Sequence, residues 1–117
     1  MVAAGVYHSD VGQADGDWPY PLPAVLGHEG AGEIEALGEG INGLSVGQRV
    51  LLSLAPGCGM CRHCIVGRPI LCQDSLDAMG DGALTTGPTP LRGADGPVAA
   101  DSLLACIAEH AVVAVRM

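Results

Sequence analysis

The chain has no lysine and no phenylalanine, and its five basic residues stand against 13 aspartates and glutamates. The formal net charge is -8 at pH 7. A surface of this sign repels phosphate groups, so the composition argues against a nucleic-acid-binding protein and against binding to anionic membranes. One Trp and two Tyr are the only aromatic residues. The core therefore has to be built from Val, Leu, Ile and Ala.

Long apolar runs are missing as well. No stretch approaches the ~20 apolar residues that span a bilayer. The opening residues, MVAAG, lack both the basic region and the apolar stretch of a secretory signal. We therefore expect a cytoplasmic protein with reduced thiols, of a length that allows one domain.

Glycine and proline are abundant, with 18 and 8 residues spread along the chain. This density interrupts long helices and favours short strands joined by turns, so we predict a mainly β fold. The expected strands lie at 2–7, 33–37, 49–54 and 111–115. A turn at 8–10 and a loop over 12–23 separate the first two, and 74–97 is expected to be irregular surface chain.

One glycine motif is misleading. Residues 38–43 read GEGING and satisfy the dinucleotide-binding pattern G-x-G-x-x-G. That fingerprint has to open a helix whose N-terminus faces a pyrophosphate. Gly47 follows closely and a strand is expected next, so no helix fits. We interpret the motif as a glycine-rich hairpin connection, and we expect no nucleotide-binding unit in this chain.

Four of the five cysteines are concentrated in one short segment. They are Cys58, Cys61, Cys64 and Cys72, with the spacing C-x2-C-x2-C-x7-C. Four thiolates saturate a tetrahedral zinc ion, so the segment at about 56–72 predicts a structural zinc lobe. An iron–sulfur cluster shares the opening spacing, but the bacterial pattern places its fourth cysteine after three residues and a proline behind it. Disulfides are the third alternative. Cys106, far off in an apolar segment, is expected to be a small buried hydrophobe.

Further short motifs occur in a fixed order along the chain. Residues 5–10 read GVYHSD, 16–19 GDWP, 26–32 LGHEGAG, 46–50 VGQRV and 108–113 AEHAVV. Each is weak evidence alone. Together, with the four-cysteine segment in its place among them, they resemble the zinc-dependent alcohol dehydrogenases of the medium-chain dehydrogenase/reductase superfamily over nearly the whole chain.

The resemblance implies a GroES-like catalytic domain, which is a partly open β-barrel with a structural zinc on an external lobe. In complete members a Rossmann domain follows and binds NAD(P), and the active site lies between the two domains. A catalytic zinc there polarises the alcohol so that hydride passes to the nicotinamide. We therefore expect residues 1–117 to be a catalytic domain that is incomplete at both ends and lacks the Rossmann domain. NAD(P) would bind only to a full-length enzyme.

The same resemblance implies roles for individual residues. His28 matches the histidine ligand of the catalytic zinc, and Glu29 matches the adjacent glutamate that can approach the metal. Asp10 matches the carboxylate that orients this histidine. Ser9 matches the hydroxyl that takes the substrate proton. These four residues are the expected catalytic set.

Three neighbours complete the expected site. Trp18 would line the alcohol pocket and restrict substrate size, and His8 stands where some members bind the cofactor's pyrophosphate. Tyr7 occupies the place of the family's first cysteine ligand, and its ring is expected to pack under the mouth of the barrel. A phenol with a pKa near ~10 is a poor zinc ligand at neutral pH. Because a further protein ligand lies beyond residue 117 in family members, we expect zinc at the cysteine lobe and not at His28.

Two functions stay open at this stage. The leading hypothesis is an alcohol dehydrogenase that oxidises a primary alcohol or reduces an aldehyde with NAD(P) when complete, and that is inactive as this chain alone. Its partner would be a small alcohol or aldehyde. The alternative is a non-catalytic, zinc-stapled module that persists for folding or association. Homo-oligomerisation is compatible with both.

Overall fold

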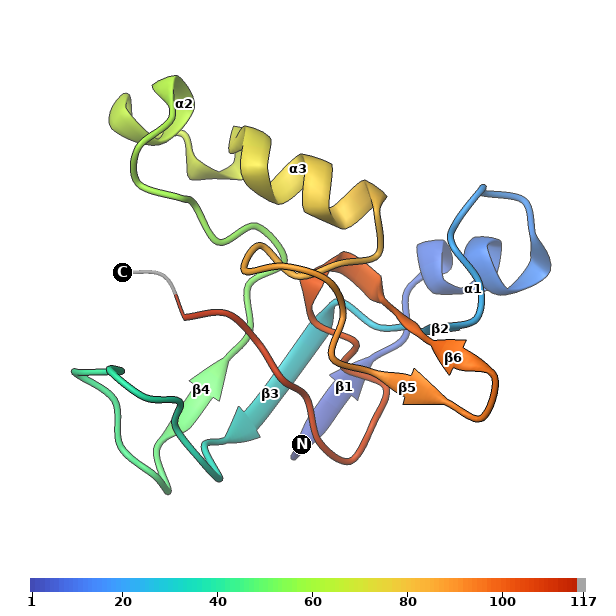
Figure 1. Cartoon of the computed structure of the whole chain (residues 1–117), viewed down its shortest axis with the longest axis horizontal. Coiled ribbons are helices and arrows are strands. Elements are labelled where there is room, and N and C mark those ends of the chain that lie inside the picture. The colour runs from blue at the N-terminus through green and yellow to red at the C-terminus, as the bar shows by residue number, and fades with distance from the viewer. Residues whose placement is uncertain (116–117) are drawn as a thin grey trace.

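The computed structural model describes residues 1–115 (Figure 1). Its strands are β1 (Ala3–Gly5), β2 (Ala24–Val25), β3 (Glu29–Glu33), β4 (Arg49–Leu51), β5 (Arg92–Gly93), β6 (Gly96–Pro97) and β7 (Ala99–Ala100). Its helices are α1 (His8–Asp15), α2 (Arg62–Ile65) and α3 (Gln73–Gly80), with 3-10 turns η1 (Pro69–Leu71) and η2 (Asp101–Leu103). Every element is short, as the glycine and proline content predicts.

The strands pair into three small sheets. β3 is the central strand of an antiparallel sheet with the order β1-β3-β4. β5 pairs with β6, and β2 pairs in parallel with β7. This parallel pair joins distant parts of the sequence, with Ala24 opposite Ala99 and Val25 opposite Ala100. It thereby brings the chain that leads into His28 beside the chain that leads into Asp101.

The core is small and made of short side chains. Leu84, Ala100 and Ala105 form its buried cluster, and Val25 and Leu91 pack against them. Cys106 is completely buried nearby. The predictions of an aliphatic core and of a buried Cys106 are confirmed.

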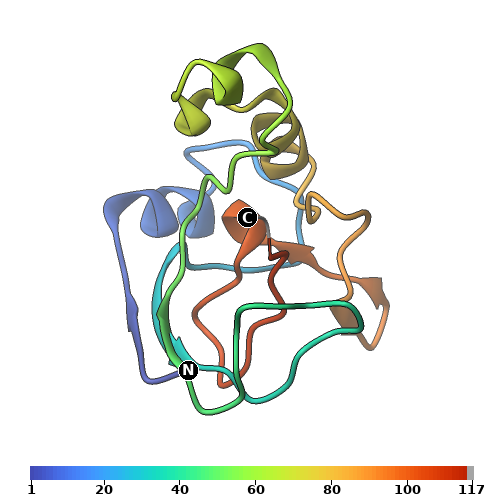
Figure 2. The same cartoon turned by 90° about the vertical axis from the view of Figure 1, so that its left-hand side faces the viewer.

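The cysteine segment stands apart from the sheets. Figures 1 and 2 show α2 projecting at one end of the molecule, and α3 returning from it toward the body. There α3 packs against η2. The Ser75 hydroxyl of α3 donates a hydrogen bond of 2.6 Å to the carbonyl oxygen of Pro56 and so ties the end of the lobe to its beginning.

Two helices form where none was predicted. α1 occupies residues expected to be a turn and the start of a loop, and α3 lies in the stretch expected to be irregular. The Asp10 carboxylate holds the start of α1 by accepting a 2.7 Å hydrogen bond from the backbone N–H of Tyr7. Gly16 ends the helix in the left-handed conformation, with φ of 82°. Both helices have eight residues. Among residues 1–115, no helix has the length and apolarity that a bilayer crossing requires.

The prediction of a mainly β fold is not confirmed, because helical residues outnumber strand residues in the described part of the chain. Hydrogen bonding over residues 1–115 defines three separate sheets and no barrel. In place of the strand expected at 33–37, β3 ends at residue 33. No strand forms at 111–115. Strands expected at 2–7 and 49–54 are present in shorter form.

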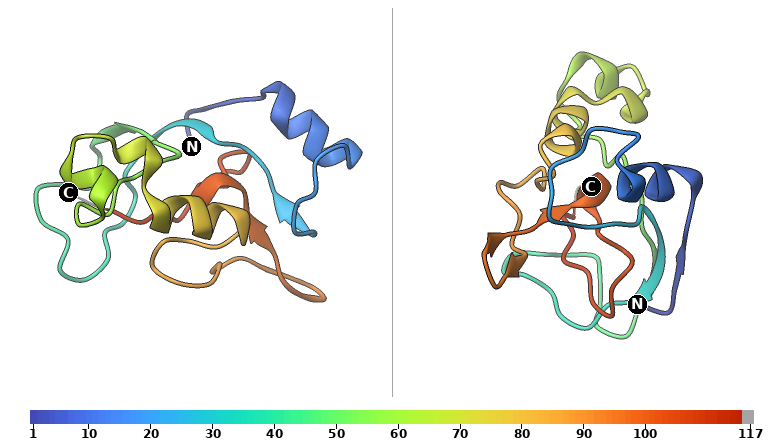
Figure 3. Two further views of the ribbon diagram at one scale, coloured as in Figure 1. Left: turned by 90° about the horizontal axis from the view of Figure 1, so that it is seen from above. Right: turned by 90° about the vertical axis from the view of Figure 1, so that its right-hand side faces the viewer.

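Close packing explains the position of β3. A Cβ atom on Gly30 would stand 2.7 Å from the Cys106 sulfur, so only glycine fits there. The GEGING motif lies in the connection between the antiparallel strands β3 and β4. Figure 3 shows this connection as an extended loop with no helix, which confirms its interpretation as a hairpin connection.

Candidate functional site

The four cysteines of the lobe converge. Their Sγ atoms all lie within 4.8 Å of one another, and none is oxidised to a disulfide. The sulfurs of Cys58 and Cys64 are 4.0 Å apart. Four thiolates around zinc, each bonded at about 2.3 Å, stand about 3.8 Å from one another. The donor set therefore fits a four-coordinate metal ion.

Backbone N–H groups point at these sulfurs. The N–H of Cys58 donates to Cys72 Sγ at 3.3 Å, and the N–H of Cys61 donates to Cys58 Sγ at 3.2 Å. Burial raises the pKa of the Cys72 thiol, but backbone hydrogen bonds from Ser75 and Cys58 outweigh it and hold the pKa at about 6. The lobe thus favours the thiolate form that metals require at this position.

The pKa values of two other thiols of the lobe, Cys61 and Cys64, are shifted in opposite directions. The backbone N–H of Cys64 lowers the pKa of Cys61. Burial raises the pKa of Cys64 to about 11. Metal binding would therefore release a proton from Cys64, and the affinity of the lobe should increase with pH.

A second cluster surrounds His28, between α1 and η2. His28 Nδ1 lies 3.6 Å from Asp10 Oδ1 and 3.4 Å from Asp101 Oδ2. On the other side of the ring, His28 Nε2 lies 3.5 Å from the Ser9 hydroxyl. Ser9, Asp10 and His28 were expected to act together, and the structure brings them together because the first turn of α1 faces His28.

Asp101 is the member of this cluster that sequence reasoning missed. Its Oδ2 accepts a 3.0 Å hydrogen bond from the Gly27 N–H, and its Oδ1 accepts from Gln13 Nε2 at 3.3 Å. The backbone that follows is held in the left-handed region at Ser102 and Leu103, with φ of 49° and 69°. The one available signal was a lone charge in the otherwise uncharged run PVAADSLLACI.

The remaining predicted site residues lie around this cluster without joining it. Glu29 is exposed on β3, with its carboxylate against Gly5, and it is not among the clustered donor atoms. Tyr7 meets His28 edge-on, with ring centroids 6.2 Å apart. Its side chain is 61% exposed, so the expectation that it packs under a barrel mouth is wrong. The ring sits at the surface because it precedes α1, whose own first turn fills the space beside His28.

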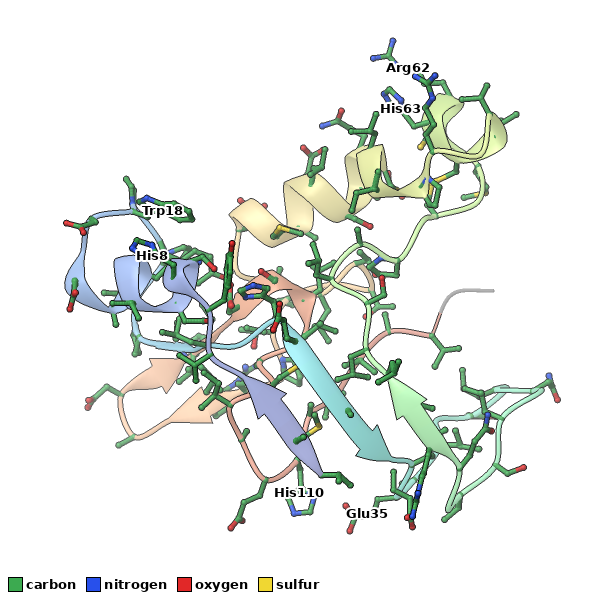
Figure 4. The ribbon with its side chains drawn as sticks, turned by 180° about the vertical axis from the view of Figure 1, so that it is seen from behind. His8, Trp18, Glu35, Arg62, His63 and His110 are labelled. Carbon is green, nitrogen blue, oxygen red and sulfur yellow. The ribbon has the colours of Figure 1, made fainter. Side chains whose placement is uncertain are left out.

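His8 is exposed, and Figure 4 shows it with Trp18 beside α1. Of the two, Trp18 lines a cavity together with His28. Arg62 and His63 lie at the outer end of the lobe in the same view, whereas Glu35 and His110 lie at the opposite end of the molecule. The four cysteines of the lobe and the cluster of Asp10, His28 and Asp101 are two separate groups of side chains that could hold a metal ion.

Two cavities meet at His28. One of about 450 Å³ is lined by Ser9, Trp18, His28 and Asp101 among others. The other, of about 740 Å³, is lined by His28, Glu29 and parts of β1, β3 and β4. Trp18 lines the first cavity, and His28 lines both.

Comparison with known proteins places the chain in a family. The family described as alcohol dehydrogenase GroES-like domain matches residues 1–115. An alcohol dehydrogenase zinc-binding domain protein from Burkholderia ambifaria is similar in structure, with a TM-score of 0.77 and 39% identity over 89% of this chain and 28% of that chain. Benzyl alcohol dehydrogenase from Acinetobacter calcoaceticus gives a TM-score of 0.73 and 36% identity over 94% and 29% of the two chains.

Relatives found by sequence support the same family assignment. Putative alcohol dehydrogenase D of Mycobacterium tuberculosis is 38% identical over 111 residues, which cover 95% of this chain and 30% of the relative. Geraniol dehydrogenase of Castellaniella defragrans is 43% identical over 99 residues, or 84% of this chain and 26% of the relative. The chain belongs to the alcohol dehydrogenase GroES-like domain family. It spans about 30% of the length of the first of these relatives.

Proposed function

We propose that this chain supplies the catalytic-domain portion of an alcohol dehydrogenase-type oxidoreductase. One observation carries the proposal: in a member of this family, Ser9 and His28 meet at the wall of a cavity that Trp18 also lines, and the buried Asp10 lies 3.6 Å from the His28 ring. The relatives named for benzyl alcohol and geraniol support a primary alcohol or the corresponding aldehyde as the substrate class.

We propose that the four cysteines bind a structural zinc ion. The sulfur separations and the backbone N–H donors fit that ion, and the similar protein from Burkholderia ambifaria is described as a zinc-binding domain protein. With all four coordination positions filled by thiolates, this metal takes no part in chemistry. Its role is to fold the lobe.

The family's catalytic zinc does not fit the matched residues alone. Tyr7 stands in place of the thiolate and its side chain is mostly exposed, and among residues 1–115 no cysteine joins the cluster around His28. We therefore derive no step through a catalytic zinc. Ser9 and His28 are the groups that would move the alcohol proton, since the hydroxyl and Nε2 lie 3.5 Å apart. His8, which is exposed, is the proposed contact for the phosphates of NAD(P), and that cofactor would supply the hydride acceptor.

Trp18 offers a direct test, because it is the only tryptophan of the chain and lines the cavity. Its fluorescence should change saturably when benzyl alcohol or benzaldehyde is titrated, and Ser9→Ala should weaken that binding. Thr85→Ala, at a residue outside the cavity lining, is the control variant and should bind like the unchanged chain. Fluorescence that stays constant for every alcohol and aldehyde tried would contradict a substrate cavity.

The non-catalytic zinc module is the second candidate. Tyr7 in place of a thiolate favours it, and so do exposed apolar side chains such as Leu51 on β4. In that case the chain would bind zinc at the lobe and associate with itself or another protein. Sedimentation of the zinc-loaded chain would show the assembly, with no fluorescence response to alcohols.

A further inference from the structure

One face of α3 borders the cavity of about 450 Å³ that Trp18 and His28 line. The α3 residues in this lining are Leu76, Met79 and Gly80. Met79 and Gly80 stand three and four positions after Leu76, so all three lie on the same side of the helix. At the C-terminal end of α3, this face therefore presents a residue without a side chain to the cavity.

A side chain at residue 80 would enter open space. Apart from its own helix backbone and chain neighbours, no heavy atom lies within 4 Å of a Cβ added at Gly80, and its φ is outside the left-handed region. Gly82, two residues further on, is different: its φ is 61°, and an added Cβ would stand 2.6 Å from the Cβ of Ala99. Packing and backbone conformation thus require glycine at residue 82 but not at residue 80.

The end of α3 is held in place beside the cavity. The backbone N–H of Ala100 donates a 2.8 Å hydrogen bond to the carbonyl oxygen of Gly82, just after the helix. At the start of the helix, the Ser75 hydroxyl is bonded to the carbonyl oxygen of Pro56. Because both ends are attached, a larger side chain at residue 80 would take volume from the cavity instead of displacing the helix.

The apolar part of the lining suits an aromatic ring. Trp18 can pack against such a ring, and the Met79 thioether makes favourable contacts with aromatic groups. The alcohol group would lie at Ser9 and His28, where the hydroxyl and Nε2 are 3.5 Å apart. The cavity volume of about 450 Å³ is within the range of about 300–1,000 Å³ that is typical of ligand pockets, and a two- or three-carbon alcohol would leave most of it unfilled.

We propose that Gly80 is a specificity-determining residue, which keeps the cavity wide enough for an alcohol that carries an aromatic ring. This inference rests on the proposed function, because it defines the size of the substrate for the same cavity. Trp18 was expected to restrict substrate size, and Gly80 offsets that restriction on the α3 side of the cavity.

The test compares a bulky alcohol with a small one. Benzyl alcohol and 1-propanol are titrated separately into the 117-residue chain, and the fluorescence of Trp18 gives a dissociation constant for each. Gly80→Leu should weaken the binding of benzyl alcohol by about tenfold, because the added side chain occupies the space of the ring. The affinity for 1-propanol should stay unchanged. A merely structural role of Gly80 would weaken the binding of both alcohols equally.

The matched control is Gly38→Leu. Gly38 also has open space around an added Cβ and a φ outside the left-handed region, but it lines neither cavity. This variant should bind both alcohols like the unchanged chain. If Gly80→Leu disturbs folding, seen as a loss of the helical circular dichroism signal, Gly80→Ala decides in its place. The smaller alanine side chain should weaken the binding of benzyl alcohol alone, by about threefold.

The outcomes separate this inference from the proposed function. Benzyl alcohol that binds as tightly to the folded Gly80→Leu variant as to the unchanged chain would overturn the role of Gly80. Equal losses for the two alcohols would overturn it as well. Both results would leave the substrate cavity in place. An unchanged chain that binds neither alcohol would contradict the proposed function and, with it, this inference.

Discussion

The lobe and the His28 cluster are two donor sets built in opposite ways. The lobe takes all its ligands from one short excursion of chain, between Cys58 and Cys72, and orients them with its own backbone N–H groups. The His28 cluster draws Asp10 from a helix near the N-terminus and Asp101 from a turn near the other end. A local donor set depends on spacing, whereas a distant one depends on how the whole domain packs.

The largest effect should follow from removing one lobe ligand. Cys61→Ser leaves three thiolates, and in small zinc domains the metal contributes on the order of 10 kcal/mol to folding. We expect the lobe to lose zinc at neutral pH and α2 to unfold, as measured by metal content and amide hydrogen exchange. Met60→Ser, at the exposed neighbouring position, should keep both. Retention of tight zinc binding in Cys61→Ser would show that the lobe is not a four-thiolate site.

The second-largest effect should follow from Gly27→Ala. The backbone N–H of Gly27 donates a hydrogen bond to Asp101, and the substitution disturbs the close packing around this contact. Gly27 has φ of 104°, and an added Cβ would stand 2.7 Å from the backbone nitrogen of Ile107. We expect a loss of at least about 2 kcal/mol in the free energy of unfolding, measured by denaturant titration. Gly40→Ala has a similarly positive φ but open space around it, so it should cost only about 1 kcal/mol. Equal losses would mean that the close approach is unimportant.

The folding stability at alkaline pH should report the environment of Tyr20, which includes the charge of Asp101. Burial, aided by the charge of Asp101, raises the Tyr20 pKa to about 12 in the folded chain. The unfolded chain ionises near pH 10, so folding stability is complete below that pH and decreases as the pH rises from 10 to 12. Because the ring is partly exposed, we expect about 1 kcal/mol.

Denaturant titrations at pH 9 and above would measure this loss. Tyr20→Phe should reduce it, because raised thiol pKa values such as that of Cys106 leave a smaller loss in the same pH range, and that variant also loses the 3.1 Å hydrogen bond to the Ala100 carbonyl and should be less stable at every pH. Tyr7→Phe, at the exposed ring, should retain it. An unchanged pH dependence in Tyr20→Phe would assign the effect to another group.

The smallest effect belongs to the surface pair of His110 and Glu35. Both side chains are mostly exposed, so Glu35→Gln should change the free energy of unfolding by less than about 1 kcal/mol. The comparison with Asp101→Asn is then direct, since the same chemical change at a buried site should have a much larger effect. Thermal unfolding of the two variants side by side would measure it.

The sequence indicated the metal lobe and the family motifs but not all the elements that carry them. α1 was not predicted because its buried residues are Asp10 and Gly12, so it has no apolar stripe for a periodicity argument to detect. α3 was missed because its few apolar residues lie within a stretch interrupted by turn signals. The strand of β3 was predicted at later residues than it occupies, because Gly30, which permits close contact with Cys106, and Gly32 resemble loop residues.

By itself, the sequence determined the short elements, the aliphatic core, the four-thiolate cluster, and the group of Ser9, Asp10 and His28. These follow from composition and from spacing over a few residues, or from motifs read in order. Only the tertiary structure decided that Tyr7 is exposed and that Asp101 faces His28. The reason is physical: the parallel pairing of β2 with β7 and the hydrogen bond from Gly27 to Asp101 join positions more than seventy residues apart, and no local pattern records such a contact.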